Sequence, residues 1–275
     1  MTTPARPVLR WHGGKWMLAP WIIDHFPPHR VYTEAFGGAA SVLLRKPRAY
    51  AEVYNDLDQE VVGLFRLLRE PSAAAELRRR VDLTPFSRAE FEQAYEFTEE
   101  PFEQARRLIV RSFFGHGSDS PRIDKSVGFR QGGHDGGRAP SRDWTNYPSA
   151  LEAIAERLRG VLVECRPAAE VIEAQDRPDA LHFVDPPYLL STRKAGSAGS
   201  YRHEMTDADH RDLARVLRAV LGGVVLSGYP SPLYDEDLYP DWNRVARSAL
   251  ADGASKRTEV LWINQAAWSA GARLL

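Results

Sequence analysis

The residues best suited to chemistry stand together at positions 185–188, where the sequence reads Asp-Pro-Pro-Tyr. They follow the apolar run 181–184, which predicts a buried strand, and open α/β sheets bind ligands just beyond the carboxyl ends of their strands. Two prolines stiffen the loop and leave its carbonyls free. The carboxylate of Asp185, the carbonyl of Pro186 and the ring of Tyr188 suit an amino group on a flat ring, which needs hydrogen-bond acceptors and a stacking surface. An ordinary turn at a strand end fits the same letters equally well.

A second candidate is the small-residue loop 34–41, Glu-Ala-Phe-Gly-Gly-Ala-Ala-Ser, which follows the β-prone run 31–36. Small residues let a ligand approach the backbone closely. The loop matches neither the dinucleotide pattern nor the phosphate-binding pattern of NTPases. Asp56 lies about 20 residues further on, where an acid binds ribose hydroxyls in related nucleotide folds. The two features together predict an adenosine-type ligand without a pyrophosphate, and the alternative is a plain glycine turn.

A third candidate is Trp11-His12-Gly13-Gly14-Lys15, which is expected to open a helix over 15–23. A lysine at the start of a helix faces the positive end of the helix dipole, which is locally unfavourable. A ligand carboxylate or an acidic side chain would relieve this, and a solvated Lys15 is the alternative.

These candidates fall on a regular succession of elements. Strand 31–36, helix 39–44, strand 51–54 and helix 59–68 follow the βαβα pattern of a parallel sheet. The same alternation resumes late in the chain. The later predicted elements are helix 150–159, strand 161–164, helix 168–174, strand 181–184, helix 207–221, strand 224–227 and strand 259–264.

The middle of the chain differs from both ends. Helices are predicted at 73–81, 88–97 and 102–114, and residues 115–148 are rich in Gly, Ser, Asp, Arg and Pro. We therefore predict that 70–148 is an insertion in an α/β domain made of 1–69 and 149–275. Residues 101–145 include eight basic residues and five acids, and this excess of positive charge indicates either a solvated surface or phosphate contacts. The basic residues are Arg106, Arg107, Arg111, Arg122, Lys125, Arg130, Arg138 and Arg142.

Composition limits the class of protein. The chain has 275 residues, and 36 Lys+Arg against 37 Asp+Glu give a net charge of -1, so overall basicity does not indicate a nucleic-acid partner. One cysteine, Cys165, excludes an internal disulfide framework and a Cys-rich zinc site, and we expect it to be buried. No histidine pair has zinc spacing, so no metal is expected.

Trp262 and Trp268 are predicted to lie in the core. Without a visible signal peptide or membrane-length apolar run, we expect a soluble cytoplasmic protein with no membrane partner.

The order Trp-x-Gly-Gly-Lys, Phe-Gly-Gly, acid and Asp-Pro-Pro-Tyr resembles the Dam-like DNA adenine-specific methyltransferases, which use S-adenosylmethionine. The late segments 224–229 and 257–262 extend the resemblance, and 110–117 is similar to phage-associated members. The family implies a Rossmann-like S-adenosylmethionine-dependent methyltransferase sheet with an inserted, mostly helical region that recognises the DNA target.

The resemblance also implies roles for individual residues. The first motif contacts the methyl donor, the glycine loop wraps its methionine part, and the acid after the second strand holds its ribose. The donor-binding residues implied in this way are Trp11, Lys15, Phe36, Gly37, Gly38, Asp56 and Asp185. In catalysis, Asp185 and the Pro186 carbonyl accept hydrogen bonds from the target amino group, and Tyr188 stacks on the flipped adenine. The family implies double-stranded DNA as partner and no metal.

Four functions remain open at this point. The first is adenine-specific DNA methylation, and the second is transfer to cytosine-N4, RNA adenine or a protein glutamine. The third is a DNA-binding module without activity, against which the complete set of motif residues argues. The fourth is an unrelated nucleotide-binding protein, which the missing phosphate motifs disfavour. The sequence does not reveal whether a partner nuclease exists.

Overall fold

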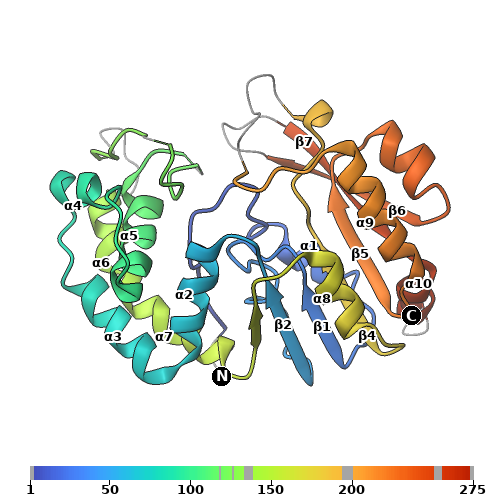
Figure 1. The fold of residues 1–275 in the computed structure, drawn as a ribbon, viewed down its shortest axis with the longest axis horizontal. Coiled ribbons are helices and arrows are strands. Elements are labelled where there is room, and N and C mark those ends of the chain that lie inside the picture. Colours follow the sequence, from blue (N-terminus) through green and yellow to red (C-terminus); the bar gives the residue numbers. More distant parts are fainter. Residues whose placement is uncertain are drawn as a thin grey trace. The chain divides into compact units, whose positions relative to one another are not determined.

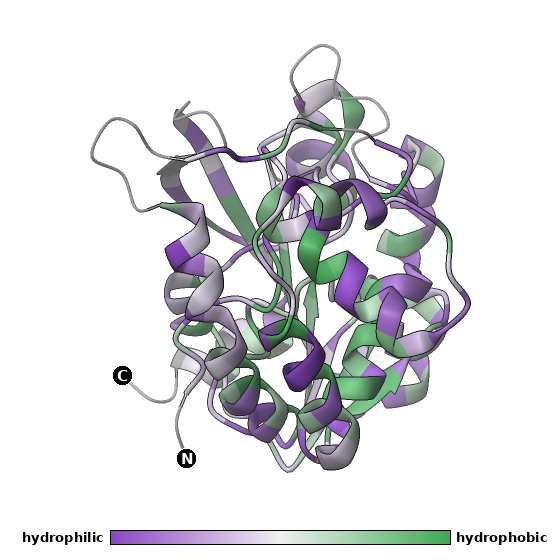
Figure 2. Ribbon diagram, turned by 90° about the vertical axis from the view of Figure 1, so that its left-hand side faces the viewer, coloured by the Kyte–Doolittle hydropathy of each residue, from purple (hydrophilic) through white to green (hydrophobic). Residues whose placement is uncertain are grey.

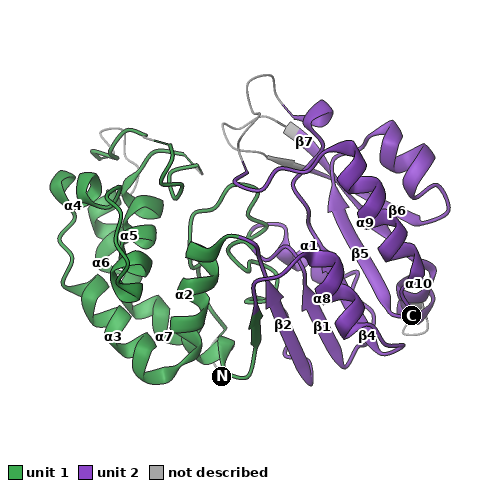
Figure 3. Ribbon diagram, in the orientation of Figure 1, with its two compact units in different colours: residues 1–16, 38–45, 58–163 green, residues 17–37, 46–57, 164–275 purple. Residues whose placement is uncertain are grey.

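The computed structural model describes residues 3–117, 119–125, 127–132, 139–193, 201–250 and 256–272. Within it the chain divides into two units, which Figure 3 shows in different colours. Most of the predicted insertion lies in the first unit, and the sheet belongs mainly to the second. The first unit consists of Met1–Trp16, Gly38–Arg45 and Asp58–Val163, and the second of Met17–Gly37, Lys46–Leu57 and Glu164–Leu275.

The second unit is built on a seven-stranded sheet with the order β3-β2-β1-β4-β5-β7-β6. Strands β2, β1, β4 and β5 pair in parallel, whereas β7 runs antiparallel to both β5 and β6. The boundary between the units falls inside β3. The strands are β1 (Val31–Glu34), β2 (Ala51–Asn55), β3 (Leu162–Glu164), β4 (Ala180–Val184), β5 (Gly223–Gly228), β6 (Asn243–Leu250) and β7 (Lys256–Ile263).

The central strands are buried because both faces of the sheet are covered. Every residue of β1, β4 and β5 is buried, as expected for parallel strands between two layers. On one face, Val224 and Leu226 join an apolar cluster with α8 (Ala168–Gln175) and α9 (Asp207–Ala219), both of which are labelled in Figure 1. On the other face α10 (Gln265–Ala272) packs so closely that a Cβ on Gly223 would lie 3.1 Å from the Ala267 side chain.

The first unit is a helical assembly around α5. Residues from Ala105 to Phe114 of that helix are all buried. The other helices carry both hydrophilic and hydrophobic residues in Figure 2, as is typical of helices with one face in a core. The helices of this unit are α2 (Gln59–Arg69), α3 (Pro71–Asp82), α4 (Arg88–Gln93), α5 (Pro101–Phe114), α6 (Pro140–Thr145) and α7 (Tyr147–Leu158).

Aromatic rings order part of the stretch 115–148 that lacks a sequence pattern. The Phe114 ring lies 4.4 Å from Phe86 and 4.7 Å from Trp144, and Trp144 stacks on Tyr147. Phe129 packs on the same group and pairs with Gly115 in an antiparallel bridge. Packing, rather than local helix or strand propensity, therefore positions Phe129, Trp144 and Tyr147 of this stretch.

Two predicted helices are wrong in extent or kind. The helix expected over 15–23 is only α1 (Ala19–Ile23), and Met17, which lies before it, is 84% exposed. The stretch 39–44 forms turns instead of a helix. There Ala40 has a φ of 52°, a left-handed conformation that an α-helix cannot contain.

Other elements had no sequence prediction. These are β6, α6, α10, the π-helical turn η2 (Leu233–Leu238) and the short 3-10 turn η1 (Leu190–Thr192). Most of the predicted strands and the longer helices are confirmed to within a few residues. Trp262 is in the core as predicted, but Trp268 is 41% exposed and Cys165 is only half-buried, so those two predictions are wrong. In the part of the chain that the structure describes, no helix has the length and hydrophobicity needed to cross a membrane.

Candidate active site

In the first unit, the tryptophan motif and the glycine loop meet. Gly38 has a φ of 46°, and a Cβ on it would lie 2.7 Å from the Trp11 indole nitrogen. Trp11 also closes its own tight turn, because the Gly14 N–H donates to the Trp11 carbonyl over 3.1 Å. The structure thus brings together two motifs that are separate in the sequence, and only glycine at position 38 allows the indole to approach the loop so closely.

Lys15 lies differently from the prediction. It is 5% exposed, and its Nζ donates a 2.7 Å hydrogen bond to the Gly13 carbonyl. It does not open a helix, since α1 begins only at Ala19. Lys15 therefore neither faces the positive end of a helix dipole nor lies in solvent, so both predictions are wrong. The ammonium group is folded over its own glycine turn, and its role toward the donor stays a prediction.

In the second unit, the glycine loop continues from the carboxyl end of β1. The Gly37 N–H donates to the Asn55 carbonyl at the end of β2 over 2.8 Å. The Asn55 side-chain amide donates to the Ala35 carbonyl over 2.9 Å, which ties the two strand ends together. A Cβ on Gly37 would lie 2.2 Å from the Tyr54 ring, so this position also needs glycine. Asp56 follows directly after Asn55, so these hydrogen bonds of Asn55 fix the backbone that carries Asp56.

Phe36 and Asp185 belong to the same edge of the sheet. Phe36 packs against the apolar cluster on one face of the sheet. The Ala35 N–H donates to the Phe183 carbonyl over 3.3 Å, which joins β1 to β4 at their carboxyl ends. Asp185 comes immediately after β4 and is half-buried. In the second unit, the structure therefore brings Phe36, Gly37, Asp56 and Asp185 to the ends of three neighbouring strands, where open α/β sheets bind ligands.

Tyr188 is anchored at its hydroxyl. The side chain is 6% exposed, and its O–H donates to Glu259 Oε2 over 2.7 Å. The hydroxyl oxygen lies 3.1 Å from Ser227 Oγ and can accept from it. Burial, and then the charges of Asp185 and Glu259, hold the pKa of Tyr188 well above the ordinary value, so the phenol is neutral at physiological pH. Ser227, at the end of the predicted strand 224–227, lies within β5.

A buried histidine lies near the Asp-Pro-Pro-Tyr loop. His210, near the start of α9, is 1% exposed, and its Nδ1 is 2.9 Å from the hydroxyl of Tyr234. Burial lowers the pKa of His210, while nearby Asp207 and Asp209 and the Pro187 carbonyl act in the opposite direction. Asp185 contributes to the raised pKa of Tyr234, after burial and Tyr239. The sequence carries a signal for this burial, because His210 shares the apolar face of the predicted helix 207–221 with Leu213 and Leu217.

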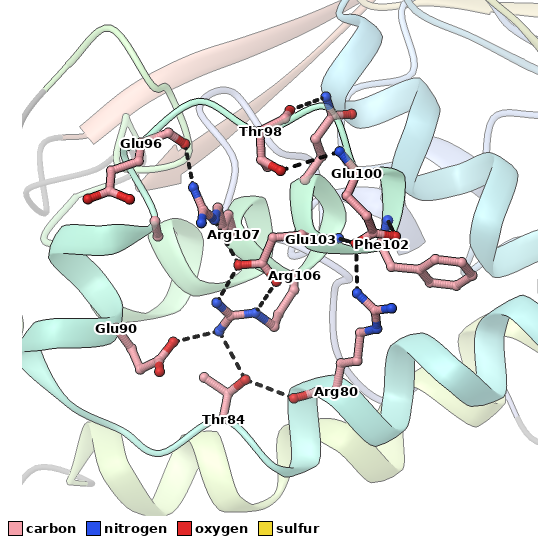
Figure 4. A network of polar contacts seen from close by, with 12 residues as sticks. Arg80, Thr84, Glu90, Glu96, Thr98, Glu100, Phe102, Glu103, Arg106 and Arg107 are labelled. Atoms are coloured by element: carbon pink, nitrogen blue, oxygen red, sulfur yellow. Dashed lines mark hydrogen bonds and ion pairs between the residues drawn. The ribbon is translucent and has the colours of Figure 1, made fainter.

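Three of the basic residues counted in the middle region have a structural role. Arg106 pairs with Glu90 and Glu103 at 2.7 Å each, and Arg107 pairs with Glu103 at 2.8 Å (Figure 4). The hydrogen bond from Arg106 is the largest cause that lowers the pKa of Glu103 to about 2. Arg111 is 1% exposed and donates to Glu60 and to the backbone carbonyl of Ala94. These three arginines form neither a solvated surface nor a row of phosphate contacts, so both readings are wrong for them.

The remaining basic residues of that count that the structure describes are less buried. Arg122 and Lys125 pair with nearby acids, Asp124 and Asp119. Arg138 lies outside the described residues. Among the residues that the structure describes, no group of three or more His, Cys, Asp or Glu side chains could hold a metal ion.

The sheet defines the class of protein. The strands β1, β2, β4 and β5 are parallel, and β7 lies antiparallel beside β5. Acids follow the carboxyl ends of β2 and β4. This arrangement fits the Rossmann-like S-adenosylmethionine-dependent methyltransferases. The family model of the D12 class N6 adenine-specific DNA methyltransferases matches residues 11–113. Two proteins named DNA adenine methylase, from two strains of Vibrio cholerae serotype O1, are each 28% identical over 199 residues, or 68% of this chain and 67% of the relative.

The chain is therefore similar to this family of DNA adenine methyltransferases. The matched residues contain the tryptophan motif, the glycine loop and Asp56. The Asp-Pro-Pro-Tyr segment lies outside that range, so its assignment depends on the geometry of the second unit.

Proposed function

We propose that the enzyme methylates the exocyclic amino nitrogen of an adenine flipped out of double-stranded DNA, with Asp185, Pro186 and Tyr188 at the reacting base. The observation that supports this most is the position of Asp185 at the end of β4, next to the strand that leads into the glycine loop. A carboxylate there can accept from a ring amino group at the sheet edge where family members bind the donor. Since its substrate is DNA, we propose that the enzyme acts in the cytoplasm.

The donor side of the proposal rests on small residues and one acid. Gly37 and Gly38 let the Tyr54 and Trp11 rings approach the backbone closely, so the loop proposed to surround the methionine part of the donor requires glycine at both positions. Asp56 supplies a carboxylate for the ribose hydroxyls, and Trp11 and Lys15 of the first unit complete the proposed set. When bound, S-adenosylmethionine supplies an electrophilic methyl group on a sulfonium.

In the proposed mechanism, this chain's residues orient the nucleophile. Asp185 and the Pro186 carbonyl accept the two N–H bonds of the adenine amino group, which directs the nitrogen lone pair away from them. The nitrogen–methyl bond forms as the sulfur–methyl bond breaks, and one amino proton leaves through Asp185 or to water. No covalent enzyme intermediate is required, so proximity and electrostatics provide the rate acceleration. Tyr188 offers its ring to the extruded base, whose unstacking costs a few kcal/mol.

We propose that residues 70–148 recognise the DNA target. The arginines of α5 are buried. We therefore propose that cations around the Gly115–Phe129 bridge contact the phosphates. Arg88 lies over the Phe129 ring at 5.1 Å, and Arg10 donates to the Gly115 carbonyl over 3.4 Å. Arg130 is close enough to Arg10 for the charge of Arg10 to add to burial in lowering the pKa of Arg130. Like charges gathered in this way favour a polyanionic partner.

The test is methyl transfer from tritiated S-adenosylmethionine to unmethylated plasmid DNA, followed by nucleoside analysis. We expect label in N6-methyladenine, and none after an Asp185→Ala substitution that leaves the fold intact. Label in cytosine would refute adenine as the target. Parallel incubations with RNA and with protein test the remaining acceptors, and transfer to either of them instead of DNA would refute the proposal.

A further inference from the structure

The anchoring of Tyr188 involves two strands of the sheet. Ser227 on β5 is 1% exposed and Glu259 on β7 is 7% exposed. Ser227 lies opposite Leu261 in the antiparallel pairing of β5 and β7, and Glu259 is two residues from Leu261. Side chains two residues apart on a strand share a face, so Ser227 and Glu259 project from the same face of the sheet. Both reach the Tyr188 hydroxyl, at 3.1 and 2.7 Å.

The ring of Tyr188 is held along its edge as well. It meets the Tyr229 ring at a centroid distance of 4.5 Å and an angle of 72°. Arg257 lies over that second ring at 5.7 Å. The prolines before Tyr188 stiffen the backbone but do not fix the side-chain torsions of the tyrosine. Its ring plane is therefore set at the far end, by the hydroxyl contacts and by the neighbouring ring.

We infer that Glu259, together with Ser227, is a positioning residue for base stacking that holds the plane of the Tyr188 ring through its hydroxyl. This inference rests on the proposed function. A carboxylate buried on a strand in the interior of the sheet is costly unless it has a strong partner. The neutral phenol donates to the charged carboxylate, and such charge-assisted hydrogen bonds are short and directional. Tyr188 contacts the base, whereas Glu259 acts only through Tyr188.

The experiment is a double-mutant cycle on Tyr188→Phe and Glu259→Ala, measured as kcat and KM for methyl transfer to unmethylated plasmid DNA. Phenylalanine keeps a ring for stacking and removes only the hydroxyl. We expect each single variant to lower kcat by on the order of tenfold, because a loosened ring misaligns the base. The double variant should be no slower than the slower single variant, since both changes remove the same contact. The KM for S-adenosylmethionine should stay constant.

Two further variants separate positioning from general damage. Glu259→Gln keeps an oxygen that can accept from the hydroxyl and should restore kcat to within about threefold of wild type. Tyr239→Phe changes another buried tyrosine of the second unit, which lies in the apolar cluster, and should leave kcat unchanged. If Glu259→Ala does not fold, Tyr188→Phe and Glu259→Gln still carry the test, with the expected values given above.

The outcomes distinguish the inference from the function beneath it. Wild-type protein that methylates adenine, with Tyr188→Phe equally active, would overturn the inference and leave the proposed function standing. Losses that multiply in the double variant would also overturn it, because Glu259 would then act independently of the hydroxyl. Wild-type protein without adenine transfer would overturn both.

Discussion

Substitution of Gly38 by alanine tests the geometry of the first unit most directly. Gly38 has a φ of 46°, and the left-handed conformation costs an L-residue about 1–2 kcal/mol. The new Cβ would lie 2.7 Å from Nε1 and 2.9 Å from Cδ1 of Trp11. These distances are too short for any real contact, so the indole or the loop must move, at a cost of about 1–3 kcal/mol. The two terms add to about 2–5 kcal/mol of lost stability or displaced structure.

This displacement should weaken donor binding, because the substitution moves both Gly38 and Trp11, two of the proposed donor contacts. If about 1.4 kcal/mol of this cost is added to the free energy of donor binding, the Kd for S-adenosylmethionine rises about tenfold. Isothermal titration calorimetry measures this Kd, and urea unfolding measures the stability change in the same preparation.

Gly63 provides the matched control, since it takes the same substitution in the same unit. It lies within α2, and a Cβ there would meet no atom within 4 Å. Alanine should therefore stabilise the helix by up to about 1 kcal/mol and leave donor affinity unchanged. A Gly38→Ala protein that binds the donor as tightly as wild type would refute the reasoning. In that case, a fall in stability alone would make Gly38 a purely structural residue.

Three further predictions concern the network of the first unit and the catalytic acid. Arg111→Ala should lower the free energy of unfolding by about 3–5 kcal/mol, because it leaves buried partners unpaired. The control Arg78→Ala, at an exposed ion pair, should change the free energy of unfolding little. Equal losses of the two variants in urea unfolding would contradict this prediction. Arg106 lowers the pKa of Glu103 from 4.5 to about 2, so this stabilisation is present above about pH 4.5 and is lost as the pH falls toward 2. Glu103→Gln should therefore be less stable than wild type at pH 7, with a difference that shrinks below about pH 4.5, and a difference that stays constant down to pH 2.5 would refute the pairing. Asp185→Ala should remove methyl transfer while circular dichroism stays unchanged, and an active variant would exclude Asp185 from the mechanism.

The longer elements follow from hydrophobic periodicity. The buried strands β1, β2, β4 and β5 are short runs rich in β-branched, aromatic and other apolar residues, and α2 and α5 carry helical patterns, so local sequence is sufficient to predict them. Alternation of these strands with helices implies a parallel sheet. The motif order then implies the methyltransferase family, which the comparisons support. The particular roles of the site residues stay predictions.

The failures share a physical cause, namely contacts between residues far apart in the chain. The stretch 39–44 consists of small and apolar residues with good helix propensity, yet Ala40 takes a left-handed conformation within the loop on which Trp11 packs. Arg111 and its neighbours look like a basic surface in a charge count. Arg106 and Arg111 are buried because Glu90 and Glu60, which come from other helices, neutralise them.

The sequence by itself determined the parallel part of the sheet, the order of the motifs and the resemblance to the family, because hydrophobic pattern and short motifs are encoded within a few consecutive residues. Only the tertiary structure decided which charges are buried, how Lys15 lies over its own turn, and which side chains hold the Tyr188 hydroxyl. Glu259 is 71 residues from Tyr188, and its carboxylate meets the hydroxyl only because β5 and β7 pair. No local pattern records such a contact, since it depends on the folded path of the whole chain.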